Sequence, residues 1–196
     1  MKTIKENMTN DIIIKNSRFI TKLVKVNNID DIDKALNDLK EEYRGATHYC
    51  YAYIIGNIKR FNDDGEPGGT AGMPILNVLE KNNLNNILCV VIRYFGGIKL
   101  GAGGLVRAYT KSVTEALKTC ETNKLVKAMK IDIEFTHDKI KLVDTIVNTV
   151  EIENKVFDLK VKYSIVIENN KIDNILNNLT NNNIDITKKE NCFIEK

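Results

Sequence analysis

The spacing of apolar positions predicts an alternation of strands and helices in the first part of the chain. Residues 12–26 are typical of two strands around a tight connection at 15–17, because apolar and polar side chains alternate there. Residues 30–43 place apolar side chains at helical spacing, with acidic residues at the start, where the helix dipole favours negative charge. Residues 48–55 favour a strand, and the nearly continuous apolar run at 88–94 is typical of a central strand.

Two glycine-rich loops interrupt this pattern, and each of them precedes a helix. The first loop covers 62–72, and the helix after it begins near Pro74, a residue that the first helical turn tolerates. The second loop covers 95–104 and is followed by a helical segment that extends to about residue 120.

The last third of the chain has its own order of elements. Strand patterns at 131–135, 156–168 and 184–193 alternate with helical patterns at 138–148 and 171–179. The segment 156–168 supplies two of the strands, so the order is β-α-β-β-α-β. This order is that of a ferredoxin-like domain.

The order of predicted strands and helices changes between residues 122 and 130, and no Pro-rich or Ser-rich linker marks the change. A chain of 196 residues is long enough for two small domains. We therefore predict an α+β protein with two domains, 1–126 and 127–196, that fold separately.

The net charge of +3 conceals an asymmetry along the chain. Residues 1–130 hold 20 Lys and Arg against 14 Asp and Glu, which makes this part +6. Residues 131–196 hold 9 against 12, which makes the rest −3. A polyanion that binds this protein should therefore bind its N-terminal part.

Cysteine usage and hydropathy indicate a reduced, cytoplasmic protein. The cysteines lie far apart without a C-x-x-C pair, so we expect no disulfide, no bound metal and no cofactor. No stretch approaches the roughly 20 apolar residues of a membrane helix. The first residues lack the apolar core of a secretory signal, so we expect no membrane partner.

The segment 93–107 carries the strongest chemical signal, because a strand, a glycine loop and a helix follow one another. Glycines let a ligand approach the backbone closely, and a helix start offers unpaired N–H groups and a positive dipole. The loop matches neither a Walker A sequence nor a strict G-x-G-x-x-G. A tight connection whose glycines permit close packing is an equally open interpretation. The candidate residues for binding an anion or a nucleic acid are Arg93, Gly97, Lys99, Gly101, Gly103, Gly104, Arg107 and Lys111.

The acidic loop 63–72 is a second candidate site. Its carboxylates could bind a metal or take part in acid/base chemistry, but they lack the ligand spacing of an EF-hand. Asp and Gly also form ordered turns by local hydrogen bonds, and we favour that interpretation. Arg93 or Arg107 could instead pair with an internal carboxylate such as Asp64. We assign no catalytic residue, and the weak candidates are His48, Asp64 and Glu66.

The strand at 48–55 offers two further hypotheses, one for each face. His48 and Cys50 share a face, and such a pair can activate a thiolate. Neighbouring positions on one face are about 7 Å apart, and a half-buried, inert Cys is much commoner. Tyr49, Tyr51 and Tyr53 share the other face, where they could stack on nucleic-acid bases. Aromatic packing within the protein is the slightly favoured alternative.

Three blocks of this sequence, taken together, resemble the signature of the IMPACT family. They read ATHYCYAY at 46–53, DDGEP with GTAG at 63–72, and RYFGG through LVRAY at 93–109. The start of the chain, through Ser17-Arg18-Phe19, also matches. The C-terminal part is similar to the additional domain of the bacterial YigZ-like members. The RWD domain of eukaryotic members has no counterpart here, and we do not expect their partner.

The resemblance implies particular folds for the two domains. The N-terminal one should be a two-layer α/β sandwich like the second domain of small-subunit ribosomal protein five. The C-terminal one should be similar to the ferredoxin-like domains of elongation factor G. These likenesses suggest contact with RNA or the ribosome, or with phosphate or another anion, and a role in translational regulation. A fold does not fix a function, so an enzyme acting on a phosphorylated small molecule and a pure protein-interaction module stay open as alternatives.

Overall fold

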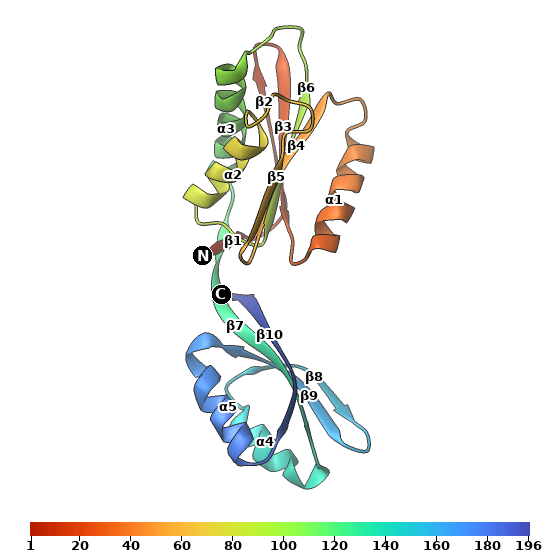
Figure 1. Ribbon diagram of the computed structural model, residues 1–196, viewed down its shortest axis with the longest axis vertical. Helices are drawn as coiled ribbons and strands as arrows, with labels where there is room; N and C mark the ends of the chain where they lie inside the picture. The colour runs from red at the N-terminus through yellow and green to blue at the C-terminus, as the bar shows by residue number, and fades with distance from the viewer. The chain divides into compact units, whose positions relative to one another are not determined.

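The computed structural model describes residues 1–196, and its contacts divide the chain into two compact units, Met1–Lys124 and Leu125–Lys196 (Figure 1). Both units combine an antiparallel sheet with helices, so the chain is an α+β protein with two domains. Independent folding of the two parts stays a prediction. No helix combines the length and the apolar character that crossing a membrane would require.

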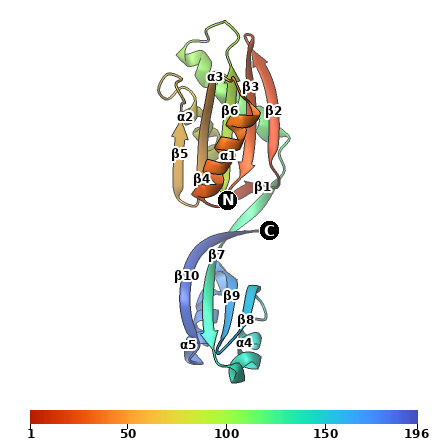
Figure 2. The same cartoon turned by 90° about the vertical axis from the view of Figure 1, so that its right-hand side faces the viewer.

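The first unit is built on a five-stranded antiparallel sheet with the order β2-β3-β6-β4-β5. Helices α2 and α3 cover one face of this sheet, and α1 covers the other (Figures 1 and 2). A short strand, β1, pairs with the first residues of β7, which then continues into the second unit. The elements are β1 (Lys2–Ile4), β2 (Met8–Ile14), β3 (Ser17–Lys25), α1 (Ile29–Glu42), β4 (His48–Ile55), β5 (Ile58–Asn62), α2 (Gly72–Lys81), β6 (Ile87–Tyr94), α3 (Ala102–Lys118) and β7 (Thr122–Phe135).

Side chains alternate between the two faces of the sheet, as the sequence predicted for β3. Phe19 and Leu23 belong to the apolar cluster beneath α2 and α3. Ile20 and Val26 belong to the separate cluster beneath α1. One strand thus supplies two cores, because successive residues of a strand point to opposite faces.

Helix α1 makes the first unit a three-layer structure, where the family resemblance implied two layers. The physical reason lies in β6, whose residues are buried at every position from Ile87 to Arg93. A strand that is apolar on both faces needs cover on both, and Ile32 and Leu39 of α1 supply it on the second face. The start of α1 is fixed by a capping box between Asn28 and Asp31.

The second unit is a ferredoxin-like domain. Its strands follow the order β8-β9-β7-β10 with antiparallel pairing throughout, and α4 and α5 pack on the sheet over one apolar core. The predicted order β-α-β-β-α-β is confirmed. The elements after β7 are α4 (Ile140–Ile146), β8 (Glu151–Phe157), β9 (Val161–Glu168), α5 (Ile172–Asn181) and β10 (Asp185–Glu195).

The hairpin of the second unit differs from its predicted boundaries. Strand β8 begins at Glu151, five residues before the predicted start at Val156. The residues between are mostly polar because β8 is exposed along most of its length, so they carry little apolar signal. Leu159 continues the alternation of β9 but lies in the turn, where 94% of its surface is exposed.

Candidate functional site

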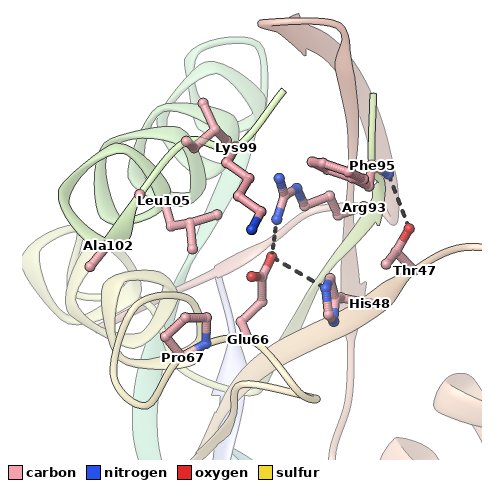
Figure 3. Close-up of a pocket in the computed structure, with 11 residues that line it drawn as sticks. Thr47, His48, Glu66, Pro67, Arg93, Phe95, Lys99, Ala102 and Leu105 are labelled. Carbon is pink, nitrogen blue, oxygen red and sulfur yellow. Dashed lines mark hydrogen bonds and ion pairs between the residues drawn. The ribbon is translucent and has the colours of Figure 1, made fainter. Parts of the chain in front are cut away.

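A pocket of about 350 Å³ lies in the first unit, where β6 ends, α3 begins and the acidic loop folds between β5 and α2 (Figure 3). It joins all three sequence blocks that we singled out, which lie far apart along the chain. Its lining is Thr47, His48, Glu66, Pro67, Arg93, Phe95, Lys99, Leu100, Gly101, Ala102 and Leu105.

A buried ion pair forms the floor of this pocket. Arg93 Nη1 lies 2.6 Å from Glu66 Oε1, and the two side chains are 5% and 4% exposed, respectively. The Tyr109 hydroxyl donates to the same oxygen at 2.7 Å. Burial raises the pKa of Tyr109, so the phenol keeps its proton and acts as the donor. Glu66 Oε1 is therefore held by a cation and by a neutral donor at once.

The acidic loop owes its shape to Asp63. Its Oδ1 accepts the N–H groups of Ala71 and Gly72 at 3.0 and 2.8 Å, and its Oδ2 accepts that of Gly69 at 2.8 Å. Gly72 is the first residue of α2, and Ala71 is its N-cap residue, which provides no side-chain cap; Gly69 lies in the loop before the helix. Asp63 thus caps α2 from eight residues away in sequence, and this bond pattern fits the ordered turn that we favoured from the sequence.

His48 is held in one orientation at the edge of the pocket. Its Nδ1 lies 2.8 Å from the backbone oxygen of Asp64. A carbonyl oxygen only accepts, so Nδ1 carries a proton, and in the neutral tautomer that has this proton the lone pair lies on Nε2. That atom lies 3.9 Å from Glu66 Oε1. The carboxylate of Asp64 itself accepts the N–H of Tyr49 at 2.6 Å, so of the three weak catalytic candidates His48 and Glu66 line the pocket and Asp64 does not.

Cys50 lies beneath the pocket and is not poised as a nucleophile. Burial raises the pKa of its thiol to about 12, so the thiolate is scarce near neutral pH. The Sγ atom donates to the Asp63 backbone oxygen at 2.9 Å and to the Tyr109 hydroxyl at 3.3 Å. The geometry therefore gives no support to an activated His–Cys pair. No group of three or more His, Cys, Asp or Glu side chains is arranged to hold a metal ion.

The glycine loop combines close packing with an open helix start. A Cβ atom on Gly96 would lie 2.1 Å from the backbone of Asn16, so this position fits only glycine. Gly101 precedes α3 with φ 69°, and α3 has no side-chain cap. Because Gly101 and Ala102 also line the pocket, the unpaired N–H groups of the first turn of α3 lie at its wall.

The predicted anion-binding residues do not all lie together. Lys99 lines the pocket and forms no ion pair within the protein, and its side chain points toward the Glu66–Arg93 pair (Figure 3). Arg93 also lines the pocket but is buried against Glu66. Arg107 lies outside the lining. Its Nη1 nevertheless lies close to Gly103 in the first turn of α3, 3.6 Å from where a Cβ atom on that residue would be. Four further residues lie on the loop or on α3 outside the lining, and anion binding by the whole set stays a prediction: Gly97, Gly103, Gly104 and Lys111.

The tyrosines of β4 lie on the opposite face of the sheet from the pocket. Tyr49, Tyr51 and Tyr53 are half-buried and pack against the cluster that α1 covers. Tyr49 also donates its hydroxyl to the backbone oxygen of Tyr43 at 2.7 Å. This packing leaves little free ring surface for bases, and base stacking here stays a prediction.

Tyr109 is the residue of the site that sequence reasoning assigned no role. Its side chain is fully buried and reaches the pocket floor from the second turn of α3. In the sequence Tyr109 occupies one position of an ordinary apolar helical stripe. Its contacts with Glu66 and Cys50, which only the structure shows, are what place it in the site.

Comparison with known proteins identifies the family. Residues 15–117, more than half of the chain, match the Impact N-terminal domain. The chain is 38% identical to "IMPACT family member YvyE" of Bacillus subtilis over 99% of its length and 93% of that protein. It is 40% identical to "IMPACT family member YigZ" of Escherichia coli over 57% of each chain.

One solved structure, described only as that of a hypothetical protein, superposes with a TM-score of 0.73 at 27% identity over 94% of this chain and 95% of the other. The chain belongs to the IMPACT family. Within the family it is similar to bacterial members such as YvyE and YigZ.

Proposed function

We propose that the protein takes part in translational control by binding RNA, free or within the ribosome, with one phosphate group held in the pocket of the first unit. The observation that carries the proposal is Lys99, a cation without an ionic partner that lines the pocket beside the uncapped start of α3. A phosphate there would meet an ammonium group and helix N-terminal N–H groups together.

The rest of the lining suits a nucleotide unit and not a bare ion. The pocket volume of about 350 Å³ lies within the range of about 300–1,000 Å³ typical of small-molecule sites. Phe95 leaves 46% of its surface exposed, and an exposed aromatic ring is a surface on which a base can stack. The excess of positive charge in residues 1–130 supports the same location. The role in translation rests on the family resemblance.

Salt dependence of binding tests this proposal. We expect the affinity for a short single-stranded RNA to fall steeply with salt, because phosphate contacts release counterions. Lys99→Ala/Arg107→Ala should flatten the log–log slope by up to about 1.4, which corresponds to two contacts on a single strand. The control is Lys34→Ala/Lys40→Ala, which removes the same charge from α1 on the opposite face of the sheet.

Fluorescence anisotropy at several salt concentrations measures both slopes, and thermal melts confirm that the variants are folded. Equal slopes for wild type and Lys99→Ala/Arg107→Ala would exclude the pocket as the RNA site. A flattened slope in the α1 control would show that the charge effect is not local.

A further inference from the structure

We propose that the pocket also cleaves the RNA that it binds, with His48 as the general base. The reaction is a transesterification in which a ribose 2′-hydroxyl attacks the adjacent phosphate. This inference rests on the proposed RNA occupant, and it adds an activity to what would otherwise be a binding site.

The orientation of His48 fits the role of a base. The Nδ1–H is directed to the Asp64 carbonyl at 2.8 Å, which leaves the Nε2 lone pair free on the neutral ring. The side chain is 19% exposed, so it is shielded from bulk water but can be reached by a group in the pocket. A positioned imidazole of this kind contributes about 10²–10⁴-fold to proton transfer.

Glu66 acts on the reaction through His48 and is a positioning residue. Its Oε1 already accepts hydrogen bonds from Arg93 and Tyr109, so it is poorly placed to remove a proton from a substrate. It lies 3.9 Å from Nε2, at which distance a carboxylate stabilises the imidazolium that forms when His48 takes up a proton. Figure 3 shows Glu66 between Arg93 and His48, with Lys99 approaching from the glycine loop.

Lys99 and the start of α3 supply the complementary charge. Attack on a phosphodiester places additional negative charge on the phosphate oxygens. An ammonium group without another ionic partner and the uncapped N–H groups of α3 lie in the same lining, where they can stabilise that charge as it develops. The base and the cationic elements therefore come from different segments and border one cavity.

The proposed step conserves atoms and electrons without a redox partner. His48 Nε2 accepts the proton of the 2′-hydroxyl, the 2′-oxygen forms a bond to phosphorus, and the bond from phosphorus to the 5′-oxygen breaks. The leaving 5′-oxygen takes a proton from water, and the imidazolium returns its proton to the hydroxide that remains. The products are a 2′,3′-cyclic phosphate and a 5′-hydroxyl end.

The test uses the full-length protein and a DNA oligonucleotide that contains a single ribonucleotide, with an all-DNA oligonucleotide as its matched control. Wild type should cut the first at the ribonucleotide, give a 2′,3′-cyclic phosphate end detectable by mass spectrometry, and leave the second intact. His48→Asn retains an N–H that can reach the Asp64 carbonyl but lacks the base at Nε2. We expect it to bind both oligonucleotides normally and to cut at least about 100-fold more slowly.

The control variant is His137→Ala, which removes the only other histidine, an exposed residue of the second unit. It should cut at the wild-type rate. Normal binding together with slow cutting by His48→Asn is a result that a purely structural histidine would not give. Bound but uncut oligonucleotide, or equal rates for wild type and His48→Asn, would overturn the activity while leaving RNA binding intact. Absence of binding both to these oligonucleotides and to the short single-stranded RNA of the salt experiment would overturn the proposed function and the activity together.

Discussion

The two units of this protein differ in where their ion pairs lie: the first buries one pair in addition to its surface pairs, and the second has surface pairs alone. In the first unit, Arg93 and Glu66 form an ion pair that is almost wholly buried, and Arg93 Nε lies buried without a hydrogen-bond partner. In the second unit the ion pairs lie at the surface, as between Lys155 and Asp144, and the core is apolar apart from the hydroxyl of Tyr163. Desolvation makes buried charge costly, so the first unit carries a local destabilisation that the second avoids. The buried pair forms the floor of the pocket, so the two units differ at the candidate site itself.

The largest expected effect comes from breaking the buried pair. Arg93→Met should leave the Glu66 carboxylate uncompensated and lower the free energy of unfolding by about 3–5 kcal/mol. Lys155→Met in the second unit removes a cation from an exposed pair and should cost at most about 1 kcal/mol. Denaturant unfolding followed by circular dichroism measures both. Similar decreases in the free energy of unfolding for the two variants would show that the buried pair contributes no more to stability than the exposed pair.

The next effect concerns the cap that the acidic loop supplies. Asp63→Ala removes the acceptor of the Ala71 and Gly72 N–H groups at the start of α2 and of the Gly69 N–H in the loop before it, and should cost about 1–3 kcal/mol. Asp173→Ala is the matched change in the second unit, because Asp173 lies in the first turn of α5 without forming a cap bond. It should cost no more than about 1 kcal/mol through the helix dipole. If both variants unfold at the same denaturant concentration, Asp63 does not cap α2 in solution.

A smaller effect depends on pH and belongs to the surface of the second unit. Hydrogen bonds from Lys160 and Lys162 lower the pKa of Glu134 below its ordinary value of 4.5. The resulting stabilisation is present above that value and is lost as the pH falls through the lower folded-state pKa. Glu134→Gln should therefore weaken the protein slightly at neutral pH and make no difference in strong acid. Added salt should reduce the neutral-pH difference, and unfolding midpoints at two pH values and two salt concentrations check both statements.

The smallest effect is expected at the hairpin tip of the second unit. Leu159 is 94% exposed, so Leu159→Ser should change the free energy of unfolding by no more than about 0.5 kcal/mol. A larger loss would mean that the tip is covered in solution. Sedimentation analysis of wild type and variant would then show whether another copy of the chain covers it.

The fold could be predicted wherever the pattern of apolar residues along the chain matched the pattern of buried side chains. β3 alternates between two cores, and the apolar run of β6 correctly indicated a central strand. Prediction failed in the first half of β8, where exposed polar residues give no apolar pattern. It also failed at Leu159, an exposed apolar residue that continues the alternation of a buried strand. The helix α1 was predicted, but two layers were expected from the family resemblance, and the amphipathic pattern of a helix does not state which face of a sheet it covers.

The candidate site was predictable as a set of motifs but not as an arrangement. The sequence offered His48, Glu66 and the basic glycine loop separately, and the structure brings them to one pocket. It did not reveal that Arg93 pairs with Glu66, 27 residues earlier in the chain. That pairing depends on the fold of the acidic loop over the end of β6, which no local spacing encodes. For the same reason Tyr109 could not be distinguished from an ordinary core residue.

The cap at Asp63 has a consequence for how a ligand would meet the pocket. The same residue accepts the N–H groups that begin α2 and, through its backbone oxygen, the bonds from Cys50 Sγ and Glu66 N–H. A displacement of the loop would therefore uncouple a helix, a strand and the pocket floor at once. The loop that carries Glu66 at the pocket floor is already held by these bonds without a ligand, so binding there would cost little conformational entropy.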